Sequence, residues 1–122
     1  MKTLVSLLLL LAPTFAFADK VARSTIVDCA KQPSYQIPDA AGTYTFTGTC
    51  TKILVAGASN HLTIESVKEL VVAGAQNTID VGGADTITVS GAMDKVHYKK
   101  GLSGAKPKVT ISGVNSTVEP TK

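Results

Sequence analysis

The stretch GASNHLTI, residues 57–64, decides the fold because two further stretches align with it without gaps. These stretches are GAQNTIDV at 74–81 and GAMDKVHY at 91–98, so the glycines recur every 17 residues. A fourth copy, GVNSTV at 113–118, follows after 22 residues and therefore contains five inserted residues. A fixed period of this size is typical of stacked repeat architectures, in which each repeat is one structural unit.

Two apolar residues precede each repeat glycine, at four and two positions before it. They are Ile53 and Val55, Leu70 and Val72, Ile87 and Val89, and Val109 and Ile111. Tyr44 and Phe46 stand in the same way before Gly48. Alternation with a period of two predicts strands that have one buried face, and β-branched residues suit such strands. Each repeat therefore contains two short strands.

Two all-β architectures contain strands of this length. An antiparallel meander or sandwich needs no 17-residue identity, whereas the coils of a β-solenoid stack equivalent residues about 4.8 Å apart. We favour a small single-domain β-solenoid over residues 44–120, with about four 17-residue coils and two short strands per coil. Stacking would join Asn60 and Asn77 in a side-chain hydrogen-bond ladder that Asp94 and Ser116 continue. The repeat glycines would form a column of turn residues free to adopt positive φ.

The first 18 residues have the features of a secretory signal peptide. Lys2 precedes an apolar run from Leu4 to Ala12, and Ala16-Phe17-Ala18 gives a small-x-small cleavage pattern. The run is too short to span a bilayer. We expect cleavage near Ala18 and export to the periplasm or the extracellular space, and the short basic region is typical of bacteria. Residues 19–43 are expected to form an N-terminal cap.

The two cysteines, Cys29 and Cys50, permit a single pairing. An exported chain meets an oxidising compartment, where an even cysteine count favours a disulfide. Closing a loop of about 20 residues would stabilise the fold by roughly 3 kcal/mol. The alternative, a catalytic or metal-binding pair, has neither nearby histidines nor C-x-x-C spacing.

A family resemblance rests on the G-x-x-N-x-apolar-x-apolar units between Cys50 and Val118. With the signal peptide and the cysteine at the entrance of the repeats, this string resembles the DUF3060 family, a domain of unknown function found in short exported bacterial proteins. The resemblance supports the repeat and export. It implies no activity and transfers no catalytic residue.

Lysines gather around the expected insertion at residues 99–108, in which Gly101, Gly104 and Pro107 indicate a protruding loop. The predicted contact residues for an anionic envelope polymer or lipid head group are Lys95, His97, Lys99, Lys100, Lys106 and Lys108. A solvated surface is the alternative. Without Lys2 the exported chain keeps 11 basic residues against 9 acidic ones, a balance that does not favour nucleic acid.

A second candidate surface is an outward row of mixed apolar and hydroxyl residues, Leu54, Val71, Thr88 and Thr110. Either the N-terminal segment covers it, or it docks a partner or a second copy of the chain.

The sequence gives little support for a catalytic or metal-binding site. His61 and His97 would lie about two strand spacings, roughly 10 Å, apart, and a bare coil offers no long loops to bring Asp80, Asp85 and Asp94 together around a sugar bond. We expect no catalytic residue, metal or cofactor. The expected function is a non-catalytic exported module that binds or scaffolds at the cell envelope. The alternatives are a minimal β-solenoid carbohydrate-active enzyme and a self-assembling extracellular fibre subunit.

Overall fold

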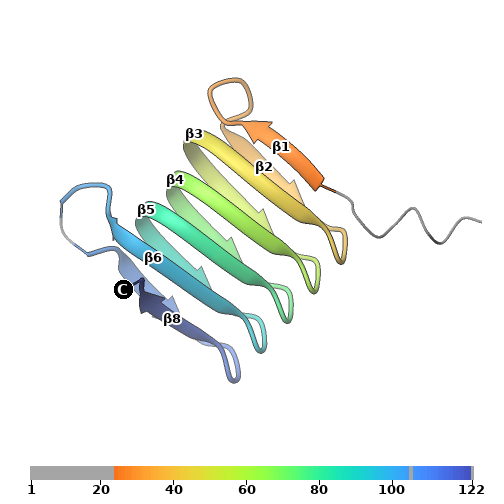
Figure 1. The fold of residues 1–122 in the computed structure, drawn as a ribbon. Coiled ribbons are helices and arrows are strands. Elements are labelled where there is room, and N and C mark those ends of the chain that lie inside the picture. Colours follow the sequence, from red (N-terminus) through yellow and green to blue (C-terminus); the bar gives the residue numbers. More distant parts are fainter. Residues whose placement is uncertain (1–23, 105, 122) are drawn as a thin grey trace, which may run out of the picture.

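The computed structural model describes residues 24–104 and 106–121, so the predicted signal peptide, residues 1–18, lies outside the described residues. The described chain is an all-β solenoid of about five turns (Figure 1). The strands are β1 (Ser24–Asp28), β2 (Ser34–Ile37), β3 (Thr43–Val55), β4 (His61–Val72), β5 (Thr78–Val89), β6 (Lys95–Gly101), β7 (Lys108–Ile111) and β8 (Thr117–Pro120). This confirms the predicted fold class.

The eight strands form one hydrogen-bonded sheet, which bends at a corner in each coil and returns along the other side (Figure 1). We call the two sides the first and the second sheet. The first sheet has the order β1-β3-β4-β5-β6-β8, and the second consists of β2, the later halves of β3, β4 and β5, and β7. The pairing is parallel throughout, and Thr63 lies beside Asp80, which lies beside His97. In the central coils the two expected short strands are continuous through the corner, so β4 and β5 each have 12 residues.

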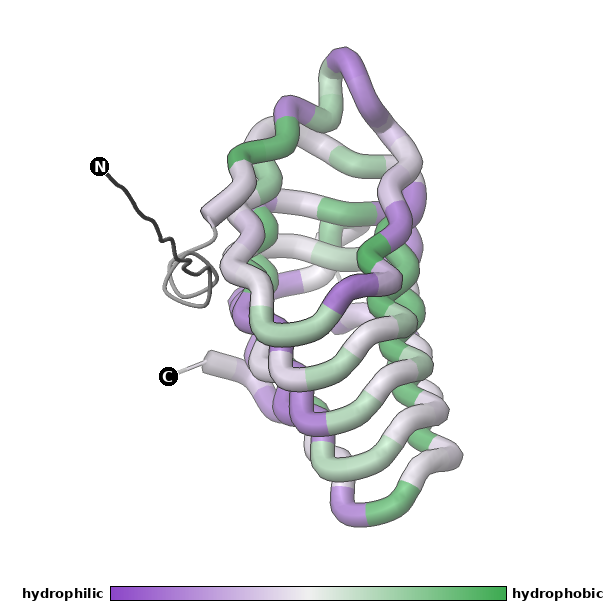
Figure 2. The backbone as a smooth tube through the Cα atoms, turned by 90° about the vertical axis from the view of Figure 1, so that its right-hand side faces the viewer, coloured by the Kyte–Doolittle hydropathy of each residue, from purple (hydrophilic) through white to green (hydrophobic). Residues whose placement is uncertain are grey.

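The core consists of buried apolar side chains from every coil. Figure 2 shows the hydrophobic positions recurring at the same place along the backbone of successive coils. In β4 the predicted inward residues are fully buried, and so is Val67 at the corner between the sheets. Val67 belongs to a column with Cys50 and Ala84, which the alternating pairs did not reveal. Burying a Val, Leu or Ile side chain contributes about 1.5–3 kcal/mol, so these columns supply most of the driving force for folding.

The glycine column exists, but the prediction that its members adopt positive φ is wrong. The positive φ angles fall two residues later, at Ser59 (58°), Gln76 (57°) and Met93 (56°). A Cβ added to Gly74 would lie 1.6 Å from the carbonyl oxygen of Gly57 in the preceding coil. The glycines are therefore required because successive turns approach too closely for any side chain.

The predicted ladder is present, but most of its bonds join a side-chain oxygen to a main-chain N–H, and one bond between side chains joins Asn77 Nδ2 to Asp94 Oδ1 at 3.0 Å. Asn77 Oδ1 accepts a hydrogen bond from the main-chain N–H of Asn60 at 3.0 Å, and Asp94 Oδ1 accepts one from the main-chain N–H of Asn77 at 2.9 Å. Ser116 Oγ accepts from the Asp94 amide at 3.1 Å. Asn60, Asn77 and Asp94 are buried, so each bond to a main-chain N–H satisfies a donor that water does not reach.

The N-terminal segment contributes a coil of its own. β1 and β2 pair with the two halves of β3, and their inward residues Val27 and Ile37 are buried. The predicted disulfide between Cys29 and Cys50 is present, with Cα atoms 4.9 Å apart. It ties this first coil to the corner of the next one.

Candidate functional site

The insertion lies at the corner between the sheets, between the end of β6 and the start of β7, and protrudes from the stack (Figure 1). It is anchored at its base, because the Leu102 amide donates to the Ala84 carbonyl at 3.1 Å and Pro107 is buried. Ser103 Oγ also donates to Asp85 Oδ1 at 2.9 Å. The insertion is thus a loop that protrudes from the corner and is held in place at its base.

The structure divides the predicted basic residues into three places. Lys99, Lys100 and Lys106 lie at the corner and in the insertion, Lys95 begins β6 at its opposite end, and Lys108 lies on the second sheet beside Thr86. Four residues of strand separate Lys95 from Lys99, a distance of about 13 Å. The corner lysines are therefore the group that can act together.

These lysines carry free charge. All five lysines of the predicted contact set are exposed. In the part of the chain that the structure describes, the single close contact between a basic and an acidic side chain joins His97 Nδ1 and Asp80 Oδ1 at 3.8 Å. No carboxylate of the described residues therefore contacts the corner lysines directly, and their ammonium groups are available to an anion.

A hollow of about 480 Å³ lies beside Lys99 on the outer surface of the first sheet. Glu65, Gly82 and Lys99 line it on successive strands, together with Thr45, Thr63 and Asp80. Sequence reasoning missed Glu65 and Gly82. Glu65, Gly82 and Lys99 follow one another at 17-residue intervals, but their grouping around one hollow becomes apparent only when the coils are placed side by side.

The three candidate aspartates lie in different environments. Asp80 faces outward beside His97, Asp85 bonds Ser103 at the corner, and Asp94 is buried in the ladder. They therefore do not flank a common substrate position. Among the described residues no three His, Cys, Asp or Glu side chains form a group that could hold a metal ion.

The second predicted surface lies on the outside of the second sheet. Its residues Leu54, Val71, Thr88 and Thr110 are neighbours on successive strands, and Gln36 of β2 extends the row. The described N-terminal residues thus continue this row instead of covering it.

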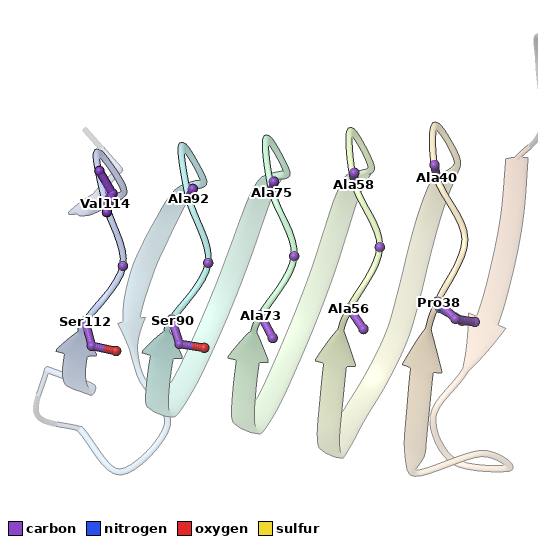
Figure 3. Close-up of a pocket in the computed structure, with 14 residues that line it drawn as sticks. Pro38, Ala40, Ala56, Ala58, Ala73, Ala75, Ser90, Ala92, Ser112 and Val114 are labelled. Atoms are coloured by element: carbon purple, nitrogen blue, oxygen red, sulfur yellow. The ribbon is translucent and has the colours of Figure 1, made fainter.

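Beside that row runs an open groove of about 720 Å³ with a small-residue lining (Figure 3). Its two walls are Pro38, Ala56, Ala73, Ser90 and Ser112, and Ala40, Ala58, Ala75, Ala92 and Val114. The groove is uncharged, and the repeat glycines that form its floor are explained by coil stacking.

Residues 40–79 and 68–115 match the family described as "Protein of unknown function (DUF3060)". The chain belongs to the DUF3060 family. The match includes β3 to β7, so the insertion and both surfaces lie within the DUF3060 region. No curated protein and no solved structure matches the chain. Among the described residues of this DUF3060 protein, no helix is long and apolar enough to cross a membrane.

Proposed function

We propose that this protein is a non-catalytic binding module, exported to the cell envelope, whose corner lysines contact an anionic polymer. The observation that supports the proposal most is the set of exposed ammonium groups of Lys99, Lys100 and Lys106 on an anchored projection, which form no ion pair with any described residue. A coil needs 17 residues to stack, so the inserted residues are not required by the repeat. Extra loops of this kind often carry binding.

The chemistry of the corner favours a polyanion over a single small anion. Lysine supplies a mobile point charge on a flexible stem, without the fixed fork that arginine offers to one phosphate. Several such charges along a loop act together on a ligand that repeats its own negative charges. The neighbouring hollow supplies hydroxyl and carboxyl groups that can hydrogen-bond the hydroxyls of a sugar-containing polymer.

Binding of fluorescent dextran sulfate to the purified protein tests the proposal. We expect a triple variant, Lys99→Ser, Lys100→Ser and Lys106→Ser, to bind at least tenfold more weakly in 50 mM salt. Parent binding should weaken steeply as salt rises, since exposed charges are screened within about 8 Å at physiological ionic strength.

The matched control removes the same charge away from the insertion, through Lys31→Ser, Lys52→Ser and Lys95→Ser, all exposed positions. The proposal predicts that this control keeps most of the affinity. Equal losses in the two triple variants would show that only net charge matters and would contradict a corner site.

The proposed export has its own test. Mass spectrometry of protein recovered outside the cytoplasm should find Asp19 as the first residue, and retention of residues 1–18 would contradict cleavage.

A further inference from the structure

The hollow beside Lys99 brings groups of both charge signs to one part of the outer surface of the first sheet. β4 contributes Thr63 and Glu65 to it, and β5 contributes Asp80. Lys99 of β6 borders it on the side of the insertion. Glu65, Asp80 and Lys99 are all exposed, so a ligand can reach each of these charged groups.

The strand register fixes the spacing of these groups. Asp80 lies one strand from Glu65 on one side and one strand from Lys99 on the other, and it is two residues out of step with each. Strands about 4.8 Å apart with a rise of about 3.3 Å per residue place each of these pairs of Cα atoms about 8 Å apart. Glu65 and Lys99 lie two strands, or about 10 Å, apart. A ligand that Lys99 holds therefore extends readily to both carboxylates.

The two carboxylates lack a lysine partner. Glu65 Oε1 accepts a hydrogen bond from the Gly48 N–H at 2.7 Å, at the irregularity in β3, so the main chain holds this side chain in place. Asp80 Oδ1 lies 3.8 Å from His97 Nδ1, which is longer than a hydrogen bond. Neither carboxylate forms an ion pair with a lysine of the described residues.

A purely anionic polymer suits the corner but not the hollow. If such a chain continued from Lys99 across the first sheet, its negative groups would pass within about 10 Å of both carboxylates. Salt screens charges only over about 8 Å at physiological ionic strength, so part of the repulsion would remain. An ammonium group at the same place is attracted instead, and its three N–H donors can bond carboxylate and threonine oxygens.

We propose that the anionic polymer is zwitterionic, with free amino groups between its negative groups, and that the hollow binds these amino groups. The corner lysines bind the anions, and Glu65 and Asp80 accept hydrogen bonds from an ammonium group beside the Thr63 hydroxyl. The amino-group site rests on the proposed function, because the corner lysines must hold the anionic part of the chain. It adds the chemical class of the polymer, which the lysines alone do not define.

Two chemically matched polymers test the proposal at neutral pH and low salt. N-desulfated heparin carries free amino groups among its carboxylates and sulfates, whereas the same material after N-acetylation keeps these anions and has no charged amine. We expect the parent to bind the free-amine polymer about fivefold more tightly, because each ammonium gains charge-assisted hydrogen bonds in the hollow. Attraction by net charge alone predicts the opposite order, since the free-amine polymer is the less negative of the two.

The double variant Glu65→Gln, Asp80→Asn tests the carboxylates themselves. Glutamine keeps the side-chain oxygen that accepts from the Gly48 N–H, so the local structure is retained. The variant should lose the preference for the free-amine polymer and should bind the N-acetylated polymer at least as tightly as the parent does. The matched control, Asp39→Asn and Glu69→Gln, removes two carboxylates at exposed positions outside the hollow and should keep the preference.

The outcomes separate the amino-group site from the corner site. Equal affinity of the parent for the two heparin derivatives, with dextran sulfate binding intact, would overturn the amino-group site and leave the corner site in place. A preference that survives in the double variant, or that is lost equally in the control, would also overturn it. A parent that binds none of the three polymers would overturn both proposals.

Discussion

At the scale of single residues, the repeat depends on glycine positions at which an added Cβ would clash with the adjacent coil. Gly74 lies directly beneath the Gly57 carbonyl, and Gly91 lies in the same way beneath that of Gly74. The sequence period predicted this column, but periodicity alone does not distinguish a glycine needed for its backbone angle from one needed for close approach. That distinction depends on the distance between coils.

Replacing Gly74 with alanine should destabilise the protein by about 3 kcal/mol, because main-chain atoms of the adjacent coil cannot move aside as a side chain would. Gly104→Ala is the matched control. Gly104 has a positive φ of 91° but no atom within 4 Å of the added Cβ, so about 1 kcal/mol of backbone strain is expected. Urea denaturation measures both values, and equal costs would contradict close approach as the cause at Gly74.

Asp94 is the one member of the ladder whose side chain does not suit its position. Asn77 Nδ2 donates to the Gly57 carbonyl at 3.1 Å, whereas the corresponding atom, Asp94 Oδ2, is buried without a hydrogen-bond partner. We therefore expect Asp94→Asn to raise the free energy of unfolding by about 1 kcal/mol, because the new amide can donate to Gly74. Asn77→Asp should lower it. Denaturation at pH 7 decides, and a less stable Asp94→Asn variant would refute this account of the ladder.

At the scale of strands and coils, alternation and the 17-residue period predicted β3 to β8 and the pairing of equivalent residues. The corner column of Cys50, Val67 and Ala84 escaped prediction because the bend shifts the alternation by one residue. The sequence predicted only a cap over residues 19–43 and not a coil, since β1 and β2 lack the repeat glycine and are joined by an irregular loop. The hollow beside Lys99 depends on lateral neighbours, which a linear pattern does not contain.

The disulfide acts at this scale by holding the first coil on the second. Its Cys29→Ser, Cys50→Ser double variant should lose about 3 kcal/mol, because the unfolded chain regains the freedom of a loop of about 20 residues. Thermal unfolding with and without reductant gives the comparison. If reduction left the stability of the parent unchanged, the bond would have no role in securing the coil.

At the scale of the whole molecule, the surfaces that can bind a partner are those that the stacking of coils does not use. Regular coils satisfy their main-chain groups through their neighbours, so the features open to partners are the insertion, the outer rows and the hollow beside Lys99. The charged corner is the feature that supports the proposed binding of a polyanion.

Every one of these assignments depends on parallel stacking of equivalent residues 17 positions apart. Nuclear Overhauser contacts in isotope-labelled protein measure that stacking most directly. The account predicts inter-strand contacts that link Thr63 to Asp80 and Asp80 to His97, in the parallel register. Contacts that instead fold β4 back against β5 in antiparallel register, with His61 near the end of β5, would contradict the solenoid and every surface built on it.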